Sequence, residues 1–363
     1  MGGRANRLRF AGRSGPAAWL GAAAWLGLAA WSGLVGPGCS AGREAATMSQ
    51  RPIVIAHRGA SGYRPEHTLA AYRLAIEQGA DFIEADVVPT RDGALVCRHE
   101  NEISQTTDVA SHPRFAHRRA VRTIDGVRVE GWFTEDFTLD ELRTLRAVER
   151  LPFRDACFNG RFPVPTLDEA IDLAVEESRR RGRTVGVYIE TKHPTYFREL
   201  GLPVEERLVA LLERQGWRDR AAPVYLQSFE VENLRRLRRL SGVRLVQLMD
   251  AQGGPWDQAG RLTYAQMATP EGLAQIARYA DAIGVNKLMV IPAEGTGLGA
   301  PTRLIADAHR VGLAVHVWTF RSDAPFLHGS YRTAADEYRR FLALGVDGLF
   351  SDFPDHALDS IRP

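Results

Sequence analysis

The sequence predicts an α/β fold in which parallel strands alternate with helices, a TIM (β/α)8 barrel. Two observations support this prediction. Short apolar runs of strand length recur along the chain, and stretches with helical periodicity separate many of them. Such alternation is typical of a parallel sheet whose outer face is covered by helices. Nine apolar runs fit an eight-stranded barrel with one extra hairpin better than the alternative, an open doubly wound sheet.

The predicted elements follow one another along the chain. The strand-like runs are Ile53–Ala56, Asp81–Val88, Ala94–His99, Val185–Thr191, Val224–Ser228, Val243–Met249, Ala282–Val285, Leu313–Thr319 and Val346–Ser351. The amphipathic helical stretches are Leu69–Gln78, Leu167–Arg181, Val204–Gln215 and Glu230–Leu240. Each helical stretch has one apolar face, which would pack against the sheet.

The second and third strands are expected to form an antiparallel hairpin. Only five residues connect them, whereas parallel neighbours need a crossover of about a dozen residues. The dipeptide Asp92-Gly93 is a strong turn signal. A two-residue loop at this dipeptide would place Asp86 opposite His99, and a loop one residue earlier would place Glu84 there. Either register brings both carboxylates and the imidazole onto adjoining strands.

A long segment, about residues 100–166, follows the third strand without a clear period. It is rich in Arg, His, Trp, Phe and Pro. We expect an insertion that serves as a lid or as a wall of the substrate site.

Residues 1–47 have the parts of a signal or lipoprotein leader. Four arginines precede an apolar stretch from Ala17 to Val35, and small residues then lead to Cys39. Lipidation of Cys39 would tether the protein to a membrane and place it in the periplasm or cell envelope. The alternatives are ordinary cleavage, an uncleaved anchor, or translation from Met48, which would give a cytoplasmic protein. Residues 48–363 would form the folded domain.

Composition and charge give no basis for a nucleic-acid partner. The chain has 363 residues, of which 45% are hydrophobic and 25% charged, with a formal net charge of +2. Four leader arginines carry +4, so the rest of the chain is near −2. Beyond the leader only Cys97 and Cys157 remain. Two cysteines do not make a disulfide framework, and we expect buried free thiols. The sequence predicts no oligomeric state.

The first apolar run ends in His57-Arg58, which indicates phosphate chemistry. The carboxyl ends of parallel strands are where active sites lie in α/β folds. An arginine can bind phosphate oxygens in bidentate fashion, and a histidine can transfer protons.

Acidic residues recur at two other strand positions. Glu84 and Asp86 are two residues apart in a strand, so they share one face. Glu190 and Lys192 repeat this spacing at the end of another strand. Carboxylates in an apolar strand are costly unless they are paired or hold a cation, and oxygen ligands favour Ca2+ or Mg2+. Lys192 would add a second cation for phosphate. A salt bridge at the strand end is the alternative for each pair alone.

Together these motifs resemble the glycerophosphodiester phosphodiesterase family, especially its periplasmic bacterial members. The resemblance rests on the ordered series His57-Arg58-Gly59-x-x-Gly62-x-x-Pro65-Glu66-His67-Thr68, Glu84-x-Asp86, His99 and Glu190-x-Lys192. Further agreements are Tyr225-Leu226-Gln227-Ser228-Phe229, Val246-Gln247-Leu248, His316-Val317-Trp318-Thr319 and Phe350-Ser351-Asp352-Phe353-Pro354-Asp355. The resemblance runs from about Ile53 to Leu358. It implies a barrel of the phospholipase-C-like phosphodiesterase type over residues 48–363.

The resemblance also implies roles for individual residues. The acid–base pair would be His57 and His99; the divalent-metal ligands would be Glu84, Asp86 and Glu190; the phosphate ligands would be Arg58 and Lys192. Phe229 and Trp318 would wall the glycerol pocket, with packing at the barrel rim as the alternative. The metal expected is Ca2+, with Mg2+ as the alternative. The family's usual His-Asp is His99-Glu100 here, which leaves the role of the acid open.

We also predict the roles of five more polar residues. Glu66 would either bridge to the neighbouring arginine or cap the first helix. His67 is expected to be structural, and Gln227 to contact water or ligand. His316, inside an apolar strand, would be a buried histidine with a satisfied hydrogen bond. Asp352 would hydrogen-bond at the barrel mouth.

The implied activity is metal-dependent hydrolysis of glycerophosphodiesters by histidine acid–base catalysis. Glycerophosphocholine and glycerophosphoethanolamine would give an alcohol and sn-glycerol 3-phosphate. One alternative is a lipid phosphodiesterase of the lysophospholipase D or sphingomyelinase type. The other is a non-catalytic lipoprotein that binds a partner in the envelope.

Overall fold

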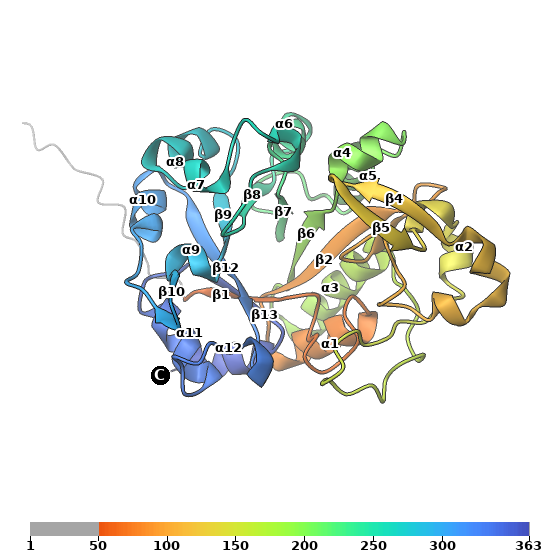
Figure 1. Cartoon of the computed structure of the whole chain (residues 1–363), viewed down its shortest axis with the longest axis horizontal. Coiled ribbons are helices and arrows are strands. Elements are labelled where there is room, and N and C mark those ends of the chain that lie inside the picture. The colour runs from red at the N-terminus through yellow and green to blue at the C-terminus, as the bar shows by residue number, and fades with distance from the viewer. Residues whose placement is uncertain (1–50, 363) are drawn as a thin grey trace, which may run out of the picture. The chain divides into compact units, whose positions relative to one another are not determined.

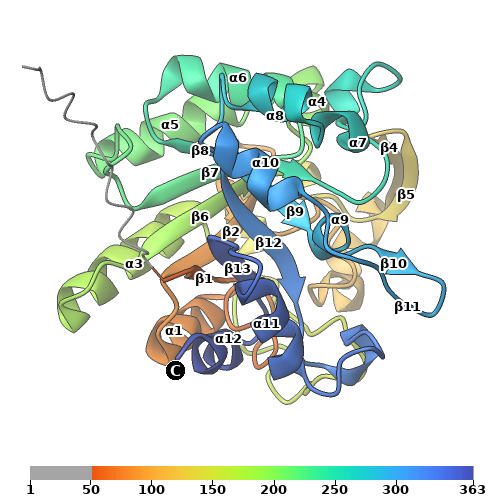
Figure 2. The same cartoon turned by 90° about the vertical axis from the view of Figure 1, so that its left-hand side faces the viewer.

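A closed barrel of eight parallel strands forms the centre of the protein in the computed structural model, which describes residues 51–362. The strand order is β1-β13-β12-β9-β8-β7-β6-β2, and pairing of β1 with β2 closes the barrel. Helices surround the strands (Figures 1 and 2). The predicted TIM barrel is therefore confirmed, and the open doubly wound sheet is excluded.

The elements lie close to their predicted positions. The barrel strands are β1 Ile53–Ala56, β2 Phe82–Pro89, β6 Gly186–Thr191, β7 Val224–Ser228, β8 Arg244–Met249, β9 Ala282–Asn286, β12 Ala314–Phe320 and β13 Gly348–Ser351. The longer helices are α1 Leu69–Gln78, α3 Leu167–Arg181, α5 Glu205–Arg214, α6 Val231–Leu240, α8 Pro270–Ile276, α10 Leu304–Arg310, α11 Ala334–Leu342 and α12 Pro354–Ile361. Between residues 51 and 362, no helix is long and apolar enough to cross a membrane.

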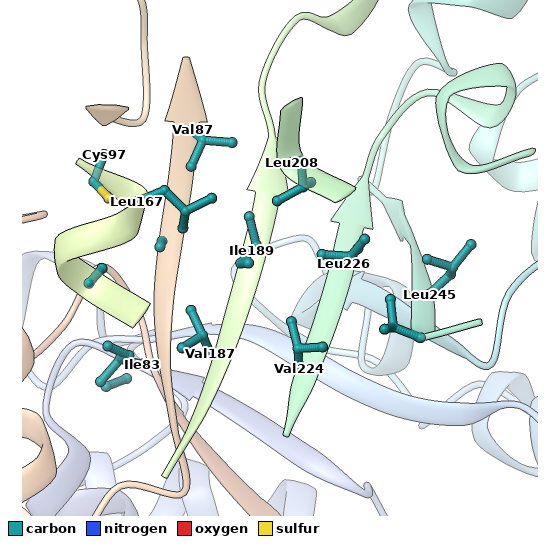
Figure 3. Packing of buried hydrophobic residues seen from close by; sticks show 14 of the residues in the cluster. Ile83, Val87, Cys97, Leu167, Val187, Ile189, Leu208, Val224, Leu226 and Leu245 are labelled. Carbon is teal, nitrogen blue, oxygen red and sulfur yellow. The ribbon is translucent and has the colours of Figure 1, made fainter. Parts of the chain in front are cut away.

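Side chains alternate between two faces along every barrel strand. Outward residues such as Ile83, Val187 and Leu226 pack against helix residues such as Leu167 and Leu208 (Figure 3). Inward residues near the amino ends of the strands form a second apolar cluster inside the barrel. This cluster consists of Ile55, Phe82, Tyr188, Val246, Ala282 and Phe350. Because the lower barrel is filled, a site can open only at the carboxyl ends of the strands.

Polar caps fix the start of the two helices that flank β2 and β3. The Thr68 side chain accepts a hydrogen bond from the backbone N–H of Ala71 at the start of α1. Thr166 and Glu169 form a reciprocal capping box at the start of α3. Each of these helices ends at a glycine in the left-handed conformation, Gly79 or Gly182.

The hairpin between β2 and β3 (Leu95–Cys97) is antiparallel, as predicted, but both expected registers were wrong. Val87 pairs with Cys97, and the N–H of Thr90 donates to the carbonyl of Ala94 at 2.9 Å. The loop therefore has three residues, with Gly93 at a φ of 83°. This register places neither Asp86 nor Glu84 opposite His99, which lies beyond the end of β3.

The insertion after β3 is more regular than its sequence indicates. It contains an antiparallel hairpin, β4 Ala120–Ile124 and β5 Val127–Gly131, and a short helix, α2 Leu139–Leu142. The turn Asp125-Gly126 has φ values of 48° and 77°, which suit a tight hairpin turn. The hairpin lies on the side of the barrel near α4 (Pro194–Glu199; Figures 1 and 2).

The two described cysteines differ in exposure. Cys97 is buried in β3, as expected, whereas Cys157 lies exposed in the insertion, so its predicted burial was wrong. Both are free thiols. The predicted leader and Cys39 lie outside the described residues.

Candidate active site

Because successive side chains along a strand point to opposite faces, every second residue points into the barrel, and polar residues lie at one end of it. In β2 the inward series Phe82, Glu84 and Asp86 changes from apolar to acidic toward the carboxyl end. Several other strands follow the same pattern, and inward polar residues meet around a cavity of about 100 Å³. Its lining includes the predicted residues His57, Arg58, Glu84, His99, Glu190, Phe229 and Trp318.

Three carboxylates form the acidic floor of the site. Glu84, Asp86 and Glu190 each offer an oxygen within 4.8 Å of the others, and all three side chains are buried. Asp86 pairs with Glu190 across neighbouring strands, and its Oδ1 atom has no hydrogen-bond partner. An all-oxygen donor set with an unpartnered buried carboxylate oxygen suits a hard divalent cation. The residues present therefore fit the implied metal.

The pKa values of two of the three carboxylates indicate a deficit of positive charge, whereas, despite burial, His67, His99 and Arg58 hold the pKa of Asp86 well below its usual range. Burial, reinforced by the charges of Asp86 and Glu190, raises the pKa of Glu84 well above its usual range. Burial also raises the pKa of Glu190 to about 7, aided by Asp86 and opposed by the nearby Lys192. A bound cation would relieve this repulsion and keep the carboxylates ionised.

Neighbouring side chains hold each carboxylate in place. Gln227 Nε2 donates to Glu84 Oε1 at 2.7 Å, and Lys192 Nζ donates to Glu190 Oε1 at 2.9 Å. His67 Nε2 lies 2.9 Å from Asp86 Oδ2. His67 therefore orients a candidate metal ligand, a contact that the sequence did not reveal. Gln227 contacts a carboxylate of the site.

His57 is held by a buried acid on the side away from the cavity. Its Nδ1 lies 2.5 Å from Asp352 Oδ1, while its Nε2 lies 4.0 Å from Glu84 Oε2. Burial, aided by the charge of Arg58, lowers the pKa of His57 to about 4 even though Asp352 opposes the shift. Because an ionised carboxylate can only accept, Nδ1 carries the proton and Nε2 of the neutral ring is free to accept one.

His99 has a similar arrangement on the opposite side of the cavity. Its Nδ1 lies 2.7 Å from Glu100 Oε1, and its Nε2 lies 3.2 Å from Lys192 Nζ. Burial and the charges of Arg58 and Lys192 lower the pKa of His99 to about 3. Glu100 therefore orients the imidazole, which gives a position to the residue that departs from the family's usual aspartate.

Arg58 enters the site from the turn after β1. Its φ of 60° is left-handed, and its backbone N–H donates to Glu84 Oε2 at 3.0 Å. Its Nη1 donates to Glu66 Oε1 at 3.0 Å. Glu66 thus bridges to Arg58, whereas Thr68 caps the helix, so the first of the two expectations for Glu66 is confirmed.

Aromatic side chains close the inner cavity. The ring centroids of Phe229 and Trp318 lie 5.9 Å apart in an edge-to-face arrangement, and both rings line the cavity. His316 lies deeper, buried, with its Nδ1 2.7 Å from Tyr188 Oη. Phe229 and Trp318 therefore line a cavity, and their role as the wall of a glycerol pocket stays a prediction. The expectation of a buried histidine with a satisfied hydrogen bond is confirmed for His316.

A second, larger cavity of about 520 Å³ lies outside the first. Arg58 and His99 line both cavities, so the two spaces meet at these residues. Residues of the insertion, including Ile124, Val127 and Arg150, line the outer cavity. The insertion therefore forms a wall beside the site, as its position in the sequence predicted.

Three arginines near the site were missed by sequence reasoning. Arg150 Nε donates to Glu66 Oε2 at 2.7 Å, Arg154 binds Asp352, and Arg321 Nε lies 3.2 Å from the same aspartate. Arg150 and Arg154 belong to the insertion, where arginines are frequent and no period distinguishes these two.

Comparison with known proteins agrees with this geometry. The glycerophosphoryl diester phosphodiesterase family matches residues 57–356. Glycerophosphodiester phosphodiesterase GDPD6 of Arabidopsis thaliana is 37% identical over 320 residues, covering 84% of this chain and 85% of the relative. Glycerophosphodiester phosphodiesterase of Haemophilus influenzae is 29% identical over 342 residues, covering 87% and 91%.

Solved structures show the same fold. A putative glycerophosphoryl diester phosphodiesterase from Silicibacter pomeroyi has a TM-score of 0.64 at 22% identity, covering 86% of this chain and 93% of that chain. A phosphodiesterase from Oleispira antarctica, solved with the product sn-glycerol-3-phosphate, has a TM-score of 0.60 at 21% identity, covering 86% and 97%. The chain belongs to the glycerophosphoryl diester phosphodiesterase family and is a phosphodiester hydrolase.

Proposed function

We propose that this enzyme hydrolyses glycerophosphodiesters such as glycerophosphocholine and glycerophosphoethanolamine to an alcohol and sn-glycerol 3-phosphate, with Ca2+ as the favoured metal and Mg2+ as the second candidate. The supporting observation is the convergence of three buried carboxylates, two cationic side chains and two acid-held imidazoles around one cavity, which all of them except Asp86 and Lys192 line directly. The product bound in the Oleispira antarctica structure supports the same substrate class.

Each group has a task in the proposed reaction. A divalent cation held by Glu84, Asp86 and Glu190 would supply positive charge against the phosphoryl oxygens. Arg58 and Lys192 bind the phosphate and stabilise the negative charge that grows in the transition state. Arg58 lines the inner cavity, and Lys192 Nζ lies 3.2 Å from the Nε2 of His99, which also lines it.

The two cavities support separate roles for the histidines. His57 lines only the inner cavity, so its free Nε2 would accept the proton of the attacking glycerol 2-hydroxyl. His99 borders both cavities and lies beside the path of the leaving alcohol. The negative phosphate of the substrate would favour uptake of a proton at its Nε2, and the protonated ring would then give that proton to the alcohol that leaves through the outer cavity. Attack by the hydroxyl would form a cyclic phosphate and break the bond to the alcohol, and water would then open the ring.

The substrate assignment is tested by measuring glycerol 3-phosphate release. Glycerophosphocholine should be turned over much faster than lysophosphatidylcholine, which carries an acyl chain. Faster choline release from lysophosphatidylcholine would favour the lysophospholipase D alternative. A folded protein inactive on both would favour the binding lipoprotein.

We also propose that residues 1–47 direct the protein to the cell envelope and that residues 48–363 form the catalytic domain. The support is the arginine-bearing, apolar leader that ends in small residues and Cys39. Cells fed labelled palmitate should incorporate label into the wild type and not into a Cys39→Ala variant. Equal labelling of both proteins would contradict lipidation at this cysteine.

A further inference from the structure

Arg154 reaches from the insertion to the barrel mouth, beside the carboxyl ends of β1, β13 and β12. It follows α2 in the chain, and only 6% of its side chain is exposed. Its Nη1 donates to the carbonyl oxygen of Ser61 at 2.9 Å, and its Nη2 donates to Asp323 Oδ2 at 2.6 Å. Nη2 also donates to Asp352 Oδ2. The guanidinium therefore joins the loop after β1, the loop after β12 and the carboxylate after β13.

The two carboxylate oxygens of Asp352 have different partners. Its Oδ1 holds the Nδ1 of His57, and its Oδ2 receives Arg154. Burial alone would raise the pKa of Asp352, yet His57, Arg321 and Arg154 together hold it well below its usual range. Arg321 contributes charge at 3.2 Å, but its Nε makes no hydrogen bond. Arg154 is thus the hydrogen-bond donor that fixes the second oxygen.

We propose that Arg154 is a positioning residue for the reaction: it clamps Oδ2 of Asp352, so that Oδ1 holds His57 with its Nε2 toward the inner cavity. This inference rests on the proposed function of His57 as a proton acceptor. A carboxylate bound through one oxygen can rotate about its side-chain torsions, whereas one bound through both oxygens is fixed. The insertion is then part of the catalytic apparatus as well as a wall of the outer cavity.

The partner Asp323 offers a matched control. It binds the same guanidinium and so helps to anchor the insertion, but among the residues described it forms no hydrogen bond with Asp352. If Arg154 merely ties the insertion to the barrel, Arg154→Gln and Asp323→Asn should alter activity alike. If Arg154 acts through Asp352, only the first substitution should affect turnover strongly.

The experiment measures kcat and KM for glycerophosphocholine in the full chain and its variants. Arg154→Gln should lower kcat by roughly 10- to 100-fold, the rate equivalent of one charge-assisted hydrogen bond, with KM changed by less than about threefold. Arg154→Lys, which keeps the charge, should recover part of the loss. Asp323→Asn should stay within about threefold of the wild type in kcat.

A double-variant cycle isolates the route through Asp352. In Asp352→Ala the clamp has nothing to position, so adding Arg154→Gln should cause no further loss of kcat. Three results would overturn the proposal. The first is a double variant whose loss of kcat is the product of the two single losses. The others are a kcat for Arg154→Gln within about threefold of the wild type, and equal losses in Arg154→Gln and Asp323→Asn. If Arg154→Gln fails to fold, the same cycle with Arg154→Lys decides. A wild type that releases no glycerol 3-phosphate would contradict the proposed function itself, which separates the two failures.

Discussion

Carboxylates hold both imidazoles of the site by their Nδ1 atoms. Asp352 binds His57, and Glu100 binds His99, so the Nε2 atom of each ring points away from its acid. Both rings have lowered pKa values because of burial and nearby cations. Neutral, oriented imidazoles of this kind are suited to accept a proton at neutral pH.

His57→Ala should abolish most turnover while leaving the fold intact. Loss of a general base typically costs about 10²- to 10⁴-fold in rate, and the removed ring contacts mainly polar neighbours. Glycerol 3-phosphate release and circular dichroism would be measured together. His117→Ala, an exposed histidine in the insertion, is the control and should retain activity. A His57→Ala rate within about tenfold of wild type would contradict the acid–base role.

Glu84→Gln should weaken metal binding and stabilise the metal-free protein. Burial, reinforced by the charges of Asp86 and Glu190, raises the pKa of Glu84, so its ionised form is unfavourable in the metal-free site. Removing that charge should raise the metal-free melting temperature and shift the metal titration of activity to higher concentration. Glu213→Gln, at an exposed glutamate, should change neither quantity. An unchanged titration would remove Glu84 from the ligand set.

At the scale of single residues, the site residues at the strand ends were easier to predict than the residues that hold them in place. His57, Glu84 and Glu190 stand in short patterns that alternate with apolar residues, so sequence alone places them on the inner face. Arg154 and His67 act through partners that are distant in sequence or hidden in the local pattern. Their positions depend on how the insertion and the turn after β1 fold back onto the barrel.

At the scale of elements, the two hairpins show that turn residues predict where a hairpin turns but not its loop length or register. The Asp92-Gly93 signal was correctly assigned to a turn, but the side chain of Thr90 helps to form a three-residue loop by accepting from Ala94 N at 2.9 Å. That one residue shifts the register of the whole ladder. In the insertion, Asp125-Gly126 gives the same kind of signal. The following strand alternates apolar and charged residues, but Val127 is exposed, so the alternation there does not mark a buried face.

The tip of the β4–β5 hairpin is bound to the barrel by His193. Its Nδ1 lies 2.6 Å from Asp125 Oδ2, and its Nε2 lies 3.0 Å from Glu100 Oε2. Burial alone would lower the pKa of His193, but its bonds to these two acids raise it to about 9. Since the folded pKa exceeds the usual 6.5, the contact stabilises the protein fully below pH 6.5 and is lost as pH rises through about 9.

The free energy of unfolding should therefore fall between pH 6.5 and 9.5 by on the order of 2 kcal/mol, after discounting for the exposed acids. Denaturant titrations at the two pH values would measure this change. His193→Gln should be less stable at the lower pH and should lose much of the pH dependence. A variant whose curve matches that of the wild type would contradict the role of this contact.

At the scale of the whole molecule, barrel closure gathers residues from distant parts of the chain. Pairing of β1 with both β2 and β13 places His57 between Glu84 and Asp352. The alternation of apolar strands with amphipathic helices predicted this closure, because few folds can cover the outer face of eight parallel strands. The path of residues 100–166 depends on contacts with loops from several strands, which no local pattern encodes.

Metal should stabilise the whole molecule, and acid should weaken the effect. A cation that binds only the folded state raises its stability by mass action. Glu190, with a pKa raised to about 7, must lose its proton to bind metal, so affinity should decline as pH falls below about 7. Ca2+ should raise the melting temperature more at pH 8 than at pH 5. An equal rise at both values would contradict binding at these carboxylates.

The most direct test of the account is glycerol 3-phosphate release from glycerophosphocholine, measured before chelation, after chelation and after Ca2+ is restored. The three-carboxylate floor predicts release that chelator stops and that Ca2+ brings back. Release that is unaffected by thorough chelation, in protein shown to have lost its metal, would contradict the central claim that Glu84, Asp86 and Glu190 hold a metal needed for phosphodiester hydrolysis.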